Sequence, residues 1–135
     1  MKSQSSINYT LRWEKRHCDI LSDFISLLDA NNVRYFILRN FEGLPHNNVS
    51  KDVDIIIAPG SYESASKILH SVLRKYGISS YRVVKYERVR CWFGIDIDKN
   101  FSIHIDLIEG YLSRGFEVFS FDVLYQNTEE YNGFK

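Results

Sequence analysis

Three aspartates carry the residue pattern best suited to chemistry. Asp52 and Asp54 stand one residue apart in KDVDIII, at the start of an apolar run, and Asp106 lies within SIHIDLI. Alternate side chains of a strand point to the same face, so Asp52 and Asp54 would share one face. Asp is disfavoured in strands, so strand propensity does not account for this pair.

A cluster of all three carboxylates would repel itself. At about 4 Å and an effective dielectric of about 20, each like-charged pair costs roughly 4 kcal/mol. Such a cluster requires a divalent cation or a shared proton. Oxygen ligands with open positions suit Mg²⁺, whose coordination substrate phosphates can complete. Two such ions can activate an attacking oxygen and stabilise a leaving one.

Plainer interpretations stand beside this one, because a D-x-D pair at a strand end is often simply solvated. Asp96 and Asp98 form a second D-x-D pair, but they adjoin a predicted turn, where Asp is common. His104 shares the predicted face of Asp106 and suits either a structural role or a role in the site. The other histidines are expected on the surface and both cysteines as buried apolar residues: His17, His46, His70, Cys18 and Cys91.

Hydrophobic spacing predicts the elements that position these side chains. Helical periodicity covers residues 13–30 and 61–77, and β-rich runs cover 33–39, 53–58, 79–89, 91–98 and 101–108. The run 53–58 suits a strand buried on both faces and therefore central in its sheet. Residues 40–51 form a loop, and 116–125 have a mixed pattern. This order predicts a mixed β-sheet with helices packed against it, in an α+β or α/β fold, of which we favour α+β.

One hairpin can be predicted in more detail. The apolar residues on both sides of its turn are expected to face the core together: Ile95, Ile97, Ile103, Ile105 and Leu107. A three-residue loop, 99–101, satisfies this condition and lets Asn100 adopt the left-handed conformation. In that register Asp106 pairs with Gly94, which would leave open space beside the carboxylate.

Composition limits the classes of protein to consider. The chain has 135 residues, which suits a single domain over 13–135 after a frayed segment, 1–12. Seventeen basic and seventeen acidic residues balance, which argues against a protein that coats nucleic acid. No apolar run reaches membrane-spanning length, and no secretory signal is visible. Two cysteines form no disulfide framework, so we expect a cytoplasmic protein with reduced thiols.

The motifs together resemble the nucleotidyltransferase domain of the DNA polymerase β superfamily. A strand, a loop, a D-x-D strand and a later strand with a third Asp follow that family's order. The stretches YFILRNFEGLP, KDVDIII and IHIDLIEGYLSRGFEVF are similar to small bacterial nucleotidyltransferase-like proteins that often accompany polysaccharide biosynthesis genes. The resemblance covers about Val33 to Phe119 and implies a nucleotidyltransferase-like mixed sheet.

The resemblance also implies the roles of individual residues. Asp52, Asp54 and Asp106 would be the ligands of one or two Mg²⁺ ions and the catalytic residues. The NTP triphosphate would bind near the turn after the first strand, where the superfamily usually has a glycine dipeptide and this chain has Arg39-Asn40. Arg39 could replace the backbone donors with a charge-assisted contact. Lys51 could also reach a phosphate, although a solvated lysine is the plainer interpretation.

Three functions follow from the residues and the resemblance. The first is an enzyme that transfers a nucleotidyl group from an NTP to an unidentified hydroxyl acceptor. The second is a module of the same fold that binds metal or nucleotide without turnover, which Arg39-Asn40 favours. The third is an antitoxin-like interaction protein. A homodimer through an edge strand or the C-terminal segment is a further alternative.

Overall fold

The computed structural model describes residues 13–38, 43–46, 52–78, 80–110, 121–128 and 134. In chain order the elements are α2 (Lys15–Ala30), β1 (Tyr35–Ile37), β2 (Val53–Ile57), α3 (Tyr62–Lys75), β3 (Ser80–Tyr86), β4 (Val89–Asp96), the 3₁₀ helix η1 (Ile97–Lys99), β5 (Phe101–Glu109) and α4 (Phe121–Gln126). The predicted α+β class is confirmed. The segment 1–12, predicted to be frayed, lies outside the described residues.

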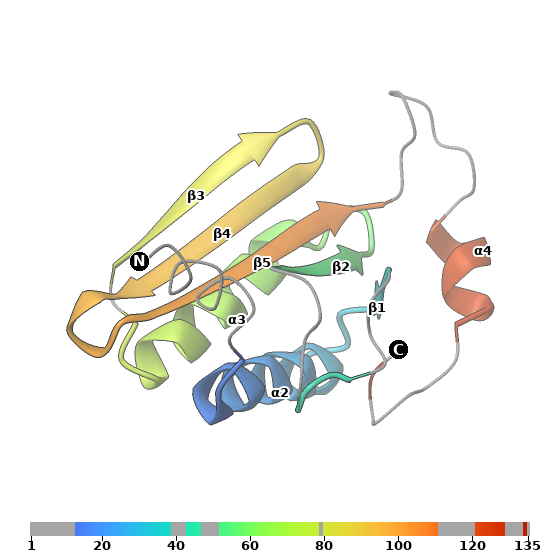
Figure 1. Ribbon diagram of the computed structural model, residues 1–135. Helices are drawn as coiled ribbons and strands as arrows, with labels where there is room; N and C mark the ends of the chain where they lie inside the picture. Colours follow the sequence, from blue (N-terminus) through green and yellow to red (C-terminus); the bar gives the residue numbers. More distant parts are fainter. Residues whose placement is uncertain are drawn as a thin grey trace, which may run out of the picture.

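The strands form one five-stranded mixed sheet in the order β1-β2-β5-β4-β3 (Figure 1). Strands β2 and β5 are parallel, and the other neighbouring pairs are antiparallel. Parallel neighbours need a long crossover connection. Here α3, β3 and β4 lie between β2 and β5 in the sequence. All five residues of β2 are buried, as the apolar run predicts for an interior strand.

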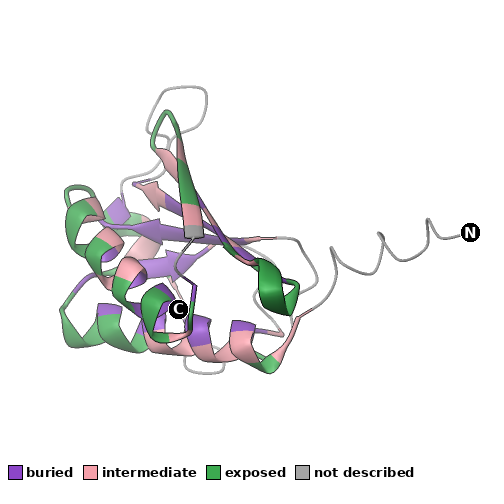
Figure 2. Ribbon diagram, turned by 90° about the vertical axis from the view of Figure 1, so that its left-hand side faces the viewer, coloured by how far each residue is buried: buried purple, intermediate pink, exposed green. Residues whose placement is uncertain are grey.

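Helices α2 and α3 cover one face of the sheet. The buried stripe of α2 includes Ile20, Phe24 and Leu28, and α3 contributes Leu69 and Leu73. They pack with alternate strand residues in one hydrophobic core, namely Tyr35, Ile55, Trp92, Ile105 and Leu107. Figure 2 shows the buried residues along the sheet and the inner sides of these helices, with exposed residues on their outer sides.

The opposite face of the sheet is covered differently. The short helix α4 packs Phe121 against Phe36 of β1 and Ile56 of β2, which forms a smaller second core. The Phe36 and Phe121 rings stack with their centroids 5.5 Å apart. Farther along β2 and β5, the same face carries Asp54 and Asp106 instead of apolar residues. This face therefore combines an apolar end with an acidic region.

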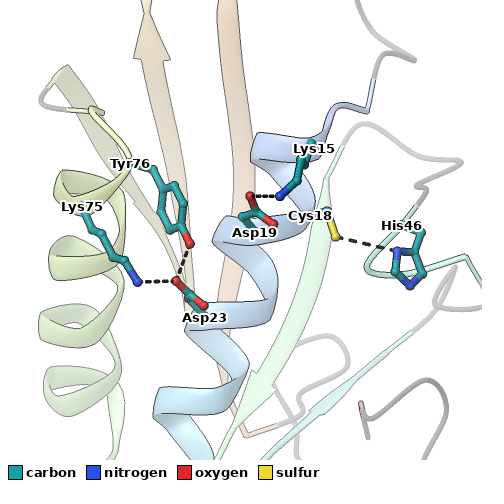
Figure 3. A network of polar contacts seen from close by, with 7 residues as sticks. All are labelled: Lys15, Cys18, Asp19, Asp23, His46, Lys75 and Tyr76. Atoms are coloured by element: carbon teal, nitrogen blue, oxygen red, sulfur yellow. Dashed lines mark hydrogen bonds and ion pairs between the residues drawn. The ribbon is translucent and has the colours of Figure 1, made fainter.

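Polar contacts also join the two long helices (Figure 3). Asp23 of α2 accepts hydrogen bonds from Lys75 Nζ at 2.8 Å and from the Tyr76 hydroxyl at 2.5 Å. The hydrogen bonds from Lys75 and Tyr76 hold the pKa of Asp23 below its usual value. On the same helix, Cys18 Sγ lies 3.9 Å from His46 Nδ1. These contacts place α2 beside α3 and a loop, on the helix-covered side of the molecule.

The start of α2 is attached to the tip of the β4–β5 hairpin by His17 and Arg16. His17 is buried, so its predicted surface position is wrong. Its Nε2 donates to the carbonyl of Ser102 at 2.7 Å, and its ring lies 4.2 Å from that of Phe101. Arg16 donates to Asp96 Oδ2 at 3.0 Å, which gives that aspartate a structural partner. The second D-x-D pair thus belongs to the hairpin tip.

The predicted register of this hairpin is wrong. Asp106 pairs with Cys91 rather than Gly94, and Trp92 and Gly94 lie on the core face. Residues 97–100 form the turn, in which η1 is followed by Asn100 with φ of 51°. The left-handed Asn100 is as predicted. The error lay in placing Ile95 and Ile97 in the core, because they are 45% and 83% exposed.

Within the described residues, no helix has both the length and the apolar character needed to cross a membrane.

Gly94 provides a test of the observed register. A Cβ at Gly94 would lie 2.9 Å from Ile78 Cγ2 and 3.2 Å from Ile103 Cγ2. Because this overpacks the core, Gly94→Ala should lower the free energy of unfolding by about 1–3 kcal/mol, as measured by urea denaturation. Ile95→Ala changes the exposed neighbouring position and should cost less. If Gly94→Ala is as stable as the parent protein, the predicted pairing with Asp106 would be favoured over the observed register.

Candidate metal centre

The three predicted aspartates come together at the junction of β2 and β5. Asp54 and Asp106 are direct partners in the parallel register. Asp52 directly precedes β2, two residues before Asp54, and its side chain joins the same group. One carboxylate oxygen from each residue lies within 4.8 Å of those from the other two. The convergence that the sequence left open is therefore present.

Local packing explains why the polar residues gather here. Along β2, Val53 and Ile55 enter the core shared with α2 and α3, so Asp54 must point to the other face. Along β5, Ile105 and Leu107 enter that core and Asp106 points away from it. The apolar neighbours thus fix the direction of both carboxylates. Asp54 is only 9% exposed, so it is held in a largely dehydrated position.

The electrostatics of the cluster shift the pKa values of Asp52 and Asp106 in opposite directions. Burial, a hydrogen bond with Asp106 and the charges of Asp54 and Asp106 together raise the pKa of Asp52 to about 6. Burial also opposes ionisation of Asp106, but hydrogen bonds from His104 and Asp52 outweigh it and lower the pKa of Asp106. In the absence of a cation and below about pH 6, Asp52 is therefore the carboxyl that keeps its proton, and the ionised Asp106 carboxylate accepts a hydrogen bond from it.

His104 is a basic group in direct contact with this cluster. Its Nε2 lies 2.7 Å from Asp106 Oδ1, and its ring lies 4.2 Å from that of Phe93. Burial lowers the pKa of His104, but the hydrogen bond to Asp106 and the nearby carboxylates outweigh burial and raise it. His104 therefore orients Asp106 and favours its ionised form.

Cys91 is the site residue that sequence reasoning missed. It was expected as a buried apolar residue without a histidine partner, yet it is half-buried and lies opposite Asp106, in a group with His104. Burial, with a hydrogen bond to Asp106, raises the pKa of its thiol to about 11. A correct register for the β4–β5 hairpin would have revealed this position.

The oxygen donors of the cluster fit a divalent cation such as Mg²⁺. This ion holds oxygens at about 2.0–2.1 Å, so oxygens on opposite sides of it lie roughly 4.2 Å apart. The three carboxylates, within 4.8 Å of one another, are close to this spacing. A cation would also relieve their mutual repulsion. The residues could therefore hold the metal that the sequence motifs imply, although acidic groups of this kind are not specific to Mg²⁺.

The residues predicted to bind nucleotide are Arg39, Asn40 and Lys51. All three are outside the described residues, as is the segment 111–120 with its R-G pair. Of the other candidates, Asp96 pairs with Arg16 and Asp98 is exposed in η1, so neither joins the acidic cluster.

Comparison of the sequence with known protein families and with curated proteins finds no match to either.

The raised pKa of Asp52 predicts an unusual pH dependence. Folding raises the pKa of the Asp52 carboxyl from about 4 in the unfolded chain to about 6. The folded protein therefore loses stability as the pH rises between these two values. Asp52→Asn should therefore stabilise the metal-free protein above about pH 6, by about 1–2 kcal/mol after allowance for solvent screening. The gain should disappear below about pH 4.

Urea denaturation in the presence of a chelator would measure this difference across the pH range. Asp98→Asn removes an exposed carboxylate from η1 and serves as the control. A pH-independent effect of Asp52→Asn, or an equal gain in the control, would contradict a like-charged cluster around Asp52.

Proposed function

We propose that this protein is a metal-dependent nucleotidyltransferase that moves a nucleotidyl group from an NTP to a hydroxyl acceptor. The observation that carries the proposal is the convergence of Asp52, Asp54 and Asp106 on one face of two parallel strands. The order of motifs in the sequence, a D-x-D strand followed by a later Asp strand, supports the same function.

The three carboxylates have distinct parts in this proposal. Asp52, Asp54 and Asp106 would hold Mg²⁺, which supplies charge neutralisation at the phosphates when bound. Asp106 would in addition accept the proton of the acceptor hydroxyl as general base. His104 contacts Asp106 at 2.7 Å and would act as a positioning residue that fixes the direction of its carboxylate.

The burial of the cluster supports a catalytic use of these charges. Asp54 and Asp106 have side chains that are largely withdrawn from water, at 9% residue and 14% side-chain exposure respectively. Electrostatic interactions are stronger in such surroundings than in bulk water. The strands also fix the carboxylates before any ligand arrives, which reduces the reorganisation that the reaction would require.

A second candidate is binding without transfer. Arg39-Asn40 replaces the glycine dipeptide whose backbone usually approaches the triphosphate in the resembling family. A domain that has the carboxylates but no backbone segment close to the triphosphate would bind metal or nucleotide without transferring the nucleotidyl group. Binding and product formation therefore have to be measured separately.

Thermal melting with each of the four NTPs, with and without Mg²⁺, tests the binding step. A ligand at about a hundredfold over its Kd adds about 2.7 kcal/mol, which raises Tm by roughly 5–10 °C in a domain of this size. We expect one NTP to give a Mg²⁺-dependent shift that Asp54→Asn abolishes. Asp98→Asn, which leaves the cluster intact, should keep the shift.

The transfer step is tested by incubation with that NTP labelled at its α-phosphate, together with sugar and peptide hydroxyl acceptors. Attachment of the label to an acceptor, lost in Asp54→Asn, is the expected result. A thermal shift without any product over hours would support the binding module instead. The absence of both would remove the case for a nucleotide and favour an interaction protein of the same fold.

A further inference from the structure

A second group of metal-ligating side chains adjoins the acidic cluster and shares one residue with it. Cys91, His104 and Asp106 each offer one ligand atom, and these atoms lie within 4.8 Å of one another. All three residues are partly buried. The group differs from the acidic cluster in its donors, which are a sulfur, an imidazole nitrogen and a carboxylate oxygen.

The sheet fixes the positions of these donors. Cys91 of β4 is the direct partner of Asp106 of β5, so the two side chains leave the same face side by side. His104 lies two residues before Asp106 and points to that face as well. The Phe93 ring, which pairs with His104 across the strands, lies 4.2 Å from the imidazole. None of these ligands comes from a loop.

The donor types distinguish this group from a magnesium site. Mg²⁺ favours oxygen ligands, whereas thiolate and imidazole favour Zn²⁺ and similar transition metals. A set of three protein ligands also leaves the fourth tetrahedral position of Zn²⁺ open to water or another ligand. Asp106 has two carboxylate oxygens, so it can face both donor sets.

We propose that Cys91, His104 and Asp106 form a Zn²⁺-binding site beside the three-carboxylate cluster, with Asp106 common to both. The thiol releases its proton to solvent as the sulfur–metal bond forms, and bonds to the metal replace the hydrogen bonds that Cys91 and His104 make to Asp106. The proposal rests on these three donors and does not require nucleotidyl transfer. The zinc site would lie next to the carboxylate cluster and would prefer a different metal.

Cobalt(II) is the probe for this site, because a thiolate bound to Co²⁺ gives a charge-transfer absorption in the near ultraviolet. Titration of the metal-free full chain with Co²⁺ should produce this band, and added Zn²⁺ should displace it. Cys91→Ser should lose the band. Cys18→Ser is the matched control, since Cys18 is the only other cysteine and lies on α2 near His46 (Figure 3); it should keep the band.

His104→Gln tests the nitrogen ligand and should lose or strongly weaken the band, while circular dichroism checks that each variant remains folded. Asp54→Asn should keep the thiolate band even though it removes a ligand of the carboxylate cluster. Failure of the zinc site and failure of the nucleotide proposal are therefore distinguishable.

Three outcomes would overturn the proposal. The first is the absence of a thiolate band in the parent protein. The second is a band that Cys18→Ser removes and Cys91→Ser retains, because the thiolate would then come from α2. The third is Co²⁺ binding without thiolate character that Asp54→Asn abolishes, because the metal would then occupy the carboxylate cluster alone.

Discussion

The parallel pairing of β2 with β5 is the interaction on which the site depends. It places Asp54 directly beside Asp106, with Asp52 at the entrance of the same strand. Repulsion within such a group costs roughly 4 kcal/mol per fully charged pair at about 4 Å. On the other face, Ile55 and Leu107 are fully buried. Burial of one such side chain contributes about 1.5–3 kcal/mol, so the apolar face offsets part of the repulsion on the acidic face.

The same pairing explains why Asp106 is central to the chemistry of this face. It receives hydrogen bonds from His104 on its own strand and from Asp52 beside β2, and it lies opposite Cys91 of β4. The oxygen donors of Asp52 and Asp54 therefore lie on the β2 side of Asp106 and the Cys91 sulfur lies on the β4 side, while His104 is on β5 itself. A cation on either side changes the charge that the opposite group experiences.

Local patterns predicted much of this structure, whereas contacts between distant segments did not follow from them. The alternation around Asp54 and Asp106 indicated polar side chains between apolar ones, and the helical stripes of α2 and α3 were equally clear. The hairpin register failed because Ile95 was expected in the core, a position that Trp92 occupies.

Two further differences have the same origin. His17 looks like a surface residue in its helix, but the hairpin tip covers it through Ser102 and Phe101. Cys91 has no histidine near it in sequence, and only the β4–β5 pairing brings His104 within reach. Such contacts depend on tertiary packing, which periodicity within one segment does not specify.

The position of β3 at the end of the sheet has a consequence for self-association. In the described part of the chain β3 has a neighbouring strand on one side only, so its other side offers backbone groups to any strand that approaches. Seven residues are enough for such pairing, but β3 carries Arg82 and Lys85 within that length. Charged side chains on an edge strand oppose its addition to another sheet, because they must lose water or meet like charges. The fold thereby protects its longer open edge from aggregation.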